Sequence, residues 1–383
     1  MLLGYGGRNC WCFKEWIDIN LRLNGHVPEK FSSNKSFSLI TGFFGANASG
    51  KTSALKIYAF ISYFITNSFS SAKESPIFND SFFDNKDNSE FYVEFTDNSN
   101  TEYRYELILQ REHVVEERIF LISNSTEDII LLREDNNITV NKLFDNSIKL
   151  ILRNNASIIS TLHQYDIIEI ENIYSFFNNT FTNVVYTGLN YELDNKINKV
   201  SEIYYKDQGA LAFASNLIRK FDTGISGIEI LLNDSPLSQS LYYPVFSHDN
   251  LKELYKLNIH SESTGTKSLY INLLNYYWCI KIGGVLILDD FDINLHHDIH
   301  PYLLKIFTEN KSNPKNAQLL FTSLNPSVMD ILGKYRTYLF EKEEGESYGY
   351  RLDEPETKIL RNDRSISEPY KRHYLGGYPK IEA

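Results

Sequence analysis

Four short, mainly apolar segments are predicted to be strands, and one of them, 285–288, is fully apolar, which is typical of a strand buried on both faces of a parallel sheet. They are residues 36–44, 285–288, 318–322 and 335–342. Segments with apolar residues at helical spacing alternate with these runs, from Ser53 onward, over 264–280 and over 298–309. Strands that alternate with helices predict an α/β fold.

A second pattern, the alternation of apolar and polar residues, marks antiparallel strands in the first third of the chain. These strands are predicted over 91–95, 103–110 and 114–122. Residues 124–245 differ, because they are rich in Asn, Ile, Tyr and Phe and contain helical patches such as 211–221. We therefore predict that 1–123, with the antiparallel strands, and 246–383 form two halves of one core. Residues 124–245 are predicted to be a mainly helical insertion.

Composition excludes several classes of protein. Hydrophobic residues make up 42% of the 383 residues, so a packed core is expected and global disorder is not. The net charge of −11 argues against a protein that mainly coats nucleic acid, although a local basic patch is compatible with it. There is no signal segment at the start, and the most apolar helix, 54–69, is too polar to span a bilayer. We expect a cytoplasmic protein with no membrane partner.

A glycine-bounded loop between the first apolar run and the helix from Ser53 carries the strongest motif. Its sequence, Gly45-Ala46-Asn47-Ala48-Ser49-Gly50-Lys51-Thr52, fits the P-loop pattern, in which backbone amides and a helix N-terminus surround phosphates. We expect residues 45–53 to bind ATP, with Lys51 at the β- and γ-phosphates and Thr52 on Mg²⁺. The alternative, a turn that binds nothing, is disfavoured because strand, loop, Lys-Thr and helix occur in order.

The apolar run 285–288 ends in two carboxylates, Asp289 and Asp290. In P-loop ATPases the first acid of such a strand holds magnesium and the second polarises the attacking water. We expect Asp289 to be a magnesium ligand and Asp290, with Lys51, to be catalytic. The alternative is a strand end with two solvated acids.

A second candidate anion site lies shortly before the acidic strand. Ser263 and Gly265 stand at the start of the helix 264–280, where a hydroxyl and backbone amides can meet an anion. In ABC-type ATPases this position is the signature motif, which contacts the γ-phosphate held by a partner subunit. An ordinary serine cap is the alternative, and the position before Asp289 favours the signature.

With these motifs in order, the chain resembles the ABC-type, AAA-like ATP-binding proteins of phage-defence and abortive-infection operons, the RloA-like group. The likeness extends along nearly the whole chain, through the P-loop, Tyr103–Glu106, Glu262–Thr266 and Leu295-His296. It implies a P-loop NTPase core of ABC-ATPase type that hydrolyses ATP with Mg²⁺ and forms a homo-oligomer through P-loop and signature contacts. It also implies a sensor or regulator of a separate effector, such as a nuclease or toxin.

Two departures from the family pattern predict slow turnover. The second acid is Asp290 where the family usually has Glu, and an aspartate is shorter by one methylene. The family's Thr-His-Asp after the last core strand is here Ser323-Leu324-Asn325, so the histidine that senses γ-phosphate is replaced by a leucine. His296, His297 and His300 follow the acids, but a polar helix start explains them better than a sensing role.

Two other classes share the P-loop and the signature. A DNA-repair ATPase of the RecF or SMC type is compatible with the sequence, provided that its arms are short. A transporter nucleotide-binding subunit fits less well, because that class normally keeps both the glutamate and the histidine.

Overall fold

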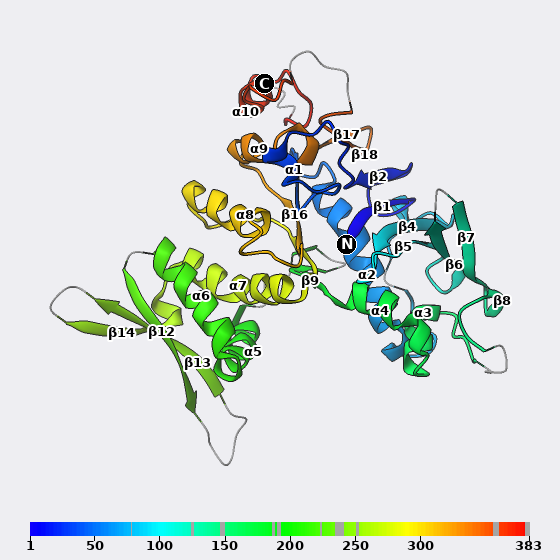
Figure 1. Ribbon diagram of the computed structural model, residues 1–383, viewed down its shortest axis with the longest axis horizontal. Coiled ribbons are helices and arrows are strands. Elements are labelled where there is room, and N and C mark those ends of the chain that lie inside the picture. The colour runs from blue at the N-terminus through cyan, green and yellow to red at the C-terminus, as the bar shows by residue number, and fades with distance from the viewer. Residues whose placement is uncertain are drawn as a thin grey trace.

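The computed structural model describes residues 1–77, 79–123, 126–145, 150–185, 188–189, 193–222, 224–233, 241–249, 253–354 and 360–379. Within them the strands form a six-stranded core sheet, a seven-stranded sheet, a three-stranded sheet and a two-stranded ribbon of Val184–Val185 (β10) and Gly188–Leu189 (β11). The seven-stranded and three-stranded sheets lie on opposite sides of the core sheet (Figure 1). No helix in these ranges is both long and apolar enough to span a lipid bilayer.

The core sheet has the order β18-β17-β3-β16-β15-β9, and neighbouring strands are parallel except at β18, which is antiparallel. Because its parallel strands end at one edge, the loops that follow β3, β15 and β16 meet there. The strands span Ile40–Gly45 (β3), Thr180–Thr182 (β9), Val285–Leu288 (β15), Gln318–Thr322 (β16), Thr337–Glu343 (β17) and Glu346–Arg351 (β18).

Both faces of the core sheet are buried, as the apolar run 285–288 predicted. Along β15, Val285 and Ile287 belong to one hydrophobic cluster, and Leu286 and Leu288 belong to another on the opposite face. The α/β class predicted from the sequence is therefore confirmed.

One face of the core sheet is covered by helix α2, which spans Lys51–Asn67 and lies between this sheet and the seven-stranded sheet. The seven-stranded sheet is antiparallel and has the order β2-β1-β4-β5-β6-β7-β8. Its strands span Leu2–Arg8 (β1), Ile17–Asn20 (β2), Ser89–Thr96 (β4), Glu102–Leu109 (β5), Val114–Ser123 (β6), Thr126–Glu134 (β7) and Asn137–Asn141 (β8).

The other face of the core sheet packs against a layer of helices and the three-stranded sheet. These elements are Leu193–Lys206 (α5), Gln208–Phe221 (α6), Thr264–Ile282 (α7), His300–Thr308 (α8), Ser327–Leu332 (α9), Ile225–Asn233 (β12), Leu241–Asp249 (β13) and Leu254–Asn258 (β14). Shorter helices elsewhere span Glu29–Ser32 (α1), Ile158–Gln164 (α3), Glu171–Asn178 (α4) and Ser367–Lys371 (α10).

The segment 124–245, expected to be mainly helical, contains helices α3 to α6 and several strands as well. Strands β7 and β8 extend the seven-stranded sheet, β9 joins the core sheet, and β12 and β13 pair with each other. On β12, Ile228 and Ile230 pack against the core, while Leu231 and Leu232 are exposed. Residue 124, the expected start of the insertion, lies outside the described ranges, and the predicted boundaries stay a prediction.

A fully buried ion pair joins two strands of the seven-stranded sheet. Glu117 on β6 faces Arg133 on β7, with Nη1 of the arginine 3.4 Å from Oε2 of the glutamate, and neither side chain is exposed. The glutamate also accepts hydrogen bonds from the Tyr105 hydroxyl at 2.8 Å, the Ser157 hydroxyl at 2.6 Å and the Ile158 amide at 2.8 Å. Burial lowers the pKa of Arg133, and Glu117 opposes this shift.

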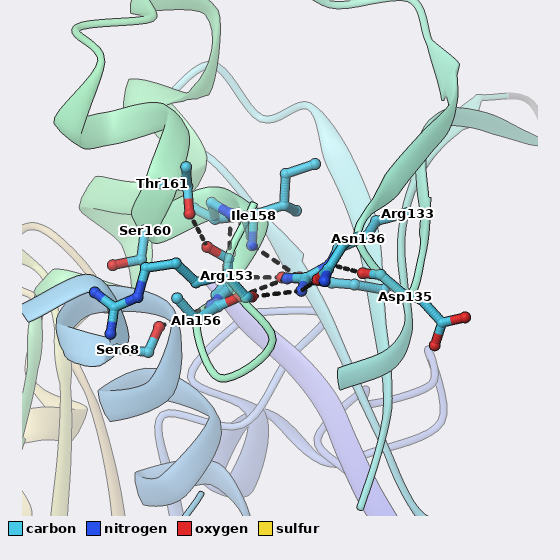
Figure 2. Close-up of polar contacts among 12 residues, drawn as sticks. Ser68, Arg133, Asp135, Asn136, Arg153, Ala156, Ile158, Ser160 and Thr161 are labelled. Atoms are coloured by element: carbon cyan, nitrogen blue, oxygen red, sulfur yellow. Dashed lines mark hydrogen bonds and ion pairs between the residues drawn. The ribbon is translucent and has the colours of Figure 1, made fainter. Parts of the chain in front are cut away.

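The same pair ties the sheet to the far end of α2, by way of the chain before α3. Arg133 donates to the carbonyl oxygens of Ala156 and, at 2.7 Å, Arg153 (Figure 2). Arg153 in turn donates to the carbonyl oxygens of Phe69 and Ser71, both at 2.6 Å. The cluster therefore fixes the seven-stranded sheet relative to the helix that begins at the P-loop.

Candidate nucleotide site

The P-loop connects the end of β3 to the start of α2 and contains three residues with positive φ. The φ angles are 151° at Gly45, 60° at Ala48 and 108° at Gly50. A Cβ atom on Gly45 would lie 2.4 Å from the carbonyl oxygen of Phe340, so a side chain does not fit there. Gly50 is the N-cap of α2 and provides no side-chain cap, and the first turn of α2 contains no acidic residue. The first amides of the helix are therefore available to an anion.

The side chains of the loop differ in exposure. Asn47 and Ala48 are exposed at its tip, and Ala46 is half-buried. The Ser49 hydroxyl is buried and has no hydrogen-bond partner among the described residues. A buried polar atom without a partner is costly, so this hydroxyl indicates a site that a ligand completes.

Lys51 is almost fully buried and bends back over the loop. Its Nζ donates to the carbonyl oxygens of Gly45 at 2.9 Å and Ala46 at 2.8 Å. Burial lowers the pKa of Lys51, and the nearby carboxylates of Asp289 and Asp290 raise it in opposition. The ammonium group thus lies at the P-loop within the field of the acidic residues.

Thr52 and Asp289 meet across the two loops. The Thr52 hydroxyl lies 2.9 Å from Oδ2 and 3.1 Å from Oδ1 of Asp289, whose side chain is buried. A hydroxyl oxygen and a carboxylate are hard oxygen donors of the kind that Mg²⁺ prefers. The two residues singled out as metal ligands from the sequence therefore lie together and fit a magnesium ion.

Two residues that the sequence did not single out hold Asp289 in place. The Thr322 hydroxyl, at the end of β16, donates to Oδ1 of Asp289 at 2.5 Å and accepts from the amide of Asp290 at 2.8 Å. The Asn183 side chain accepts from the Asp289 amide at 2.8 Å and donates to its carbonyl oxygen at 3.0 Å. Thr322 could have been found from the sequence, because it ends a segment that is predicted to be a buried strand of the same sheet. Asn183 follows a three-residue strand that no sequence pattern marks.

Asp290 has a left-handed backbone, with φ of 51°, and is partly exposed at the same edge. Burial raises its pKa, as do Asp289 and Asp292, while Lys51 lowers it. An acid with a raised pKa beside a phosphate loop suits a group that accepts a proton or polarises water.

The signature segment begins α7 in a well-defined cap. Ser263 is the N-cap residue, and its hydroxyl accepts from the Thr266 amide at 3.0 Å. A Cβ on Gly265 would lie 2.5 Å from the carbonyl oxygen of Asn294, in the loop after Asp290. Only glycine therefore fits at position 265 against that loop. Across the described part of the chain no hydrogen bond joins Ser263 or Gly265 to the P-loop.

The loop after β16 carries Leu324, which is 56% exposed. His300 is buried, and its Nδ1 lies 3.3 Å from the side-chain nitrogen Nδ2 of Asn325, so this histidine contacts the loop. Burial lowers the pKa of His300, which favours the neutral ring. His296 and His297 are exposed.

The fold of this chain is similar to that of a solved structure. The structure resembles that of an SMC head bound to the C-winged helix domain of ScpA, with a TM-score of 0.52, 12% identity, and coverage of 92% of this chain and 98% of that one. It also matches a RecF structure with a TM-score of 0.35, 13% identity, and coverage of 91% and 98%. No curated protein sequence matches the chain significantly.

A family model described as "AAA domain, putative AbiEii toxin, Type IV TA system" matches residues 40–330. This range contains the P-loop, the signature segment, the acidic strand and the loop with Leu324, and it makes up most of the chain. The chain belongs to this family of P-loop ATPases.

Proposed function

We propose that the protein binds ATP with Mg²⁺ at the P-loop and hydrolyses it slowly. The observation that carries this proposal is the contact of Thr52 with Asp289 beside Lys51, in a loop with an unpartnered serine hydroxyl. Backbone amides of 45–53 surround the phosphates, and Lys51 turns from the loop carbonyls to the β- and γ-phosphates. Thr52 and Asp289 hold the ion, which neutralises phosphate charge when bound.

Asp290 orients the attacking water and accepts its proton. Its side chain is shorter than the usual glutamate, so the water is held less well in line with the γ-phosphate. Leu324 cannot donate a hydrogen bond to that phosphate. Both departures lower turnover without weakening ATP binding, which suits a nucleotide-gated switch more than a motor.

A complete site contains two chains. Ser263 and Gly265 stand at the start of α7, a 19-residue helix, and have no hydrogen bond to the P-loop of their own chain within the described residues. They contact the γ-phosphate held by a second copy. ATP therefore joins two protomers, and its hydrolysis releases them.

The dimer is tested by light scattering on the Asp290→Asn variant, in which ATP persists. With ATP and Mg²⁺ the expected mass is that of two chains, and with ADP that of one chain. Adding Ser263→Arg should prevent the ATP-dependent dimer while leaving ATP binding within about threefold. A protein that binds ATP tightly and stays monomeric would contradict the shared site.

The role that fits best is a cytoplasmic sensor or regulator in anti-phage defence that controls a separate effector, such as a nuclease or toxin. The RloA-like resemblance and the toxin–antitoxin wording of the family description support it. The direct test is affinity purification of the native complex with and without ATP. An effector that co-elutes in one nucleotide state supports the role, and a complex made only of DNA-repair proteins argues against it.

An ATPase of RecF or SMC type is the second candidate, because the SMC head likeness covers 98% of that chain. That head is bound to the C-winged helix domain of ScpA, and a small partner domain would fit this second function. ATP-dependent binding of duplex DNA that weakens steeply with salt would favour this function.

A further inference from the structure

We propose that Asp292 is a positioning residue that sets the loop Ser323–Asn325 relative to Asp289 and Asp290. The inference rests on the proposed ATPase function and assigns a role to a third acid of the same edge. Through hydrogen bonds within one chain, Asp292 keeps this loop in place beside the reacting groups.

The contacts are concentrated on one oxygen atom. Oδ2 of Asp292 accepts from the Ser323 hydroxyl at 3.0 Å, the Leu324 amide at 3.2 Å and the Asn325 amide at 3.1 Å. Three donors from consecutive residues on one carboxylate oxygen fix the loop in orientation as well as in distance.

The loop is also anchored at its start, between the P-loop strand and the acidic loop. The Ser323 amide donates to the carbonyl oxygen of Phe43 on β3 at 3.1 Å. The Phe291 amide donates to the carbonyl oxygen of Thr322 at 3.0 Å, and the Thr322 hydroxyl bridges Asp289 and Asp290. Asp292 therefore completes a set of contacts that link three loops at one sheet edge.

This arrangement has a consequence for the missing histidine. The Ser323 hydroxyl and the Leu324 amide donate to Asp292, the Asn325 amide is shared between Asp292 and the Ser323 hydroxyl, and the Leu324 side chain is exposed. The donors that the loop could offer to a phosphate are thus used within the chain. Asp292 holds the loop still, and the side chain at 324 decides what it presents to the nucleotide.

The test compares Asp292→Ala with Asp292→Asn in the full chain. An asparagine keeps one oxygen that can accept the same three hydrogen bonds, and an alanine keeps none. We expect Asp292→Ala to lower kcat about tenfold with KM and the ATP Kd changed less than threefold, and Asp292→Asn to keep kcat within about threefold. Loss of thermal stability in the alanine variant with an unchanged kcat would overturn the positioning role.

Hydrogen exchange gives a second reading that does not depend on turnover. The amides of Leu324 and Asn325 should exchange at least about tenfold faster in Asp292→Ala than in wild type, and near the wild-type rate in Asp292→Asn. Equal exchange in all three proteins would overturn the inference. If wild-type protein failed to bind ATP, the proposed function would fall, whereas this exchange measurement would still decide the role of Asp292.

Discussion

The molecule has two buried clusters that each combine a cation with a carboxylate, Glu117 with Arg133 and Lys51 with Asp289. They differ in the groups to which their polar atoms are hydrogen-bonded. Arg133 donates to three backbone carbonyls, and Glu117 accepts from two hydroxyls and an amide. Lys51 instead donates to carbonyls of the loop it closes, and the nearby Ser49 hydroxyl has no partner in the described residues. The charged groups of Glu117 and Arg133 have their partners within the chain, whereas a ligand can complete the site around Lys51.

The largest expected effect is on stability and comes from breaking the buried pair of Glu117 and Arg133. Glu117→Ala leaves Arg133 buried without its counter-ion and should lower the free energy of unfolding by about 3–5 kcal/mol. Urea unfolding measures this. The matched control Glu90→Ala, which breaks the more exposed pair with Arg8, should cost less than about 1 kcal/mol. Equal losses of unfolding free energy in the two variants would show that burial does not make the Glu117–Arg133 pair more important for stability.

At the nucleotide edge the effect should be on rate and not on folding. Asp290→Asn removes the group that accepts the proton of water, so turnover should fall at least about 100-fold while ATP affinity stays within about threefold. A phosphate-release assay measures turnover, with Asp298→Asn, an exposed acid of the same loop region, as the control. Turnover unchanged in Asp290→Asn would remove Asp290 from the mechanism.

A smaller change should sharpen the role of the loop after β16. Leu324→His supplies a side chain that can donate to the γ-phosphate, so turnover should rise about tenfold, which is ~1.4 kcal/mol in the barrier. Leu324→Phe lacks a donor and should give no rise. A rise that persists when Asp292→Ala is added would contradict the positioning role of Asp292.

The smallest effect concerns pH. The pKa of Asp290 is raised in the folded protein, so its stabilising contribution exists below the unfolded pKa of about 3.9 and is lost as pH rises through the folded pKa. At pH 7 without Mg²⁺ or nucleotide, Asp290→Asn should therefore raise the Tm by about one degree. The difference between the two proteins should shrink towards pH 4. A difference that grows on acidification would have the wrong sign.

The sequence predicted four of the six core strands, β3, β15, β16 and β17, because mainly apolar segments are typical of strands buried on both faces. The sequence placed Thr52 and Asp289 together because each follows a strand of the same parallel sheet. Thr52 lies at the start of α2 after β3, and Asp289 follows β15 directly. The motif spacing therefore carried most of the nucleotide site.

Other features depend on contacts between distant segments and left little trace in the sequence. Asn183 holds Asp289 across 106 residues, and Asp292 is one acid among several until the loop at 323–325 is seen beside it. The strands between 126 and 249 were hidden for a similar reason. Strand conformation depends on the sheet that a segment joins, and the partner of β9, for example, is β15, which lies far along the chain.

Calorimetric titration of ATP with Mg²⁺ tests the central claim most directly, that the loop around Lys51 encloses a polyphosphate. Wild-type protein should bind about one ATP per chain, and chelation of Mg²⁺ should weaken that binding. Lys51→Ala should show no measurable binding heat, while Lys56→Ala, further along the same helix with its ammonium over Trp11, should bind like wild type. Equal ATP affinity in Lys51→Ala and wild type would contradict the account.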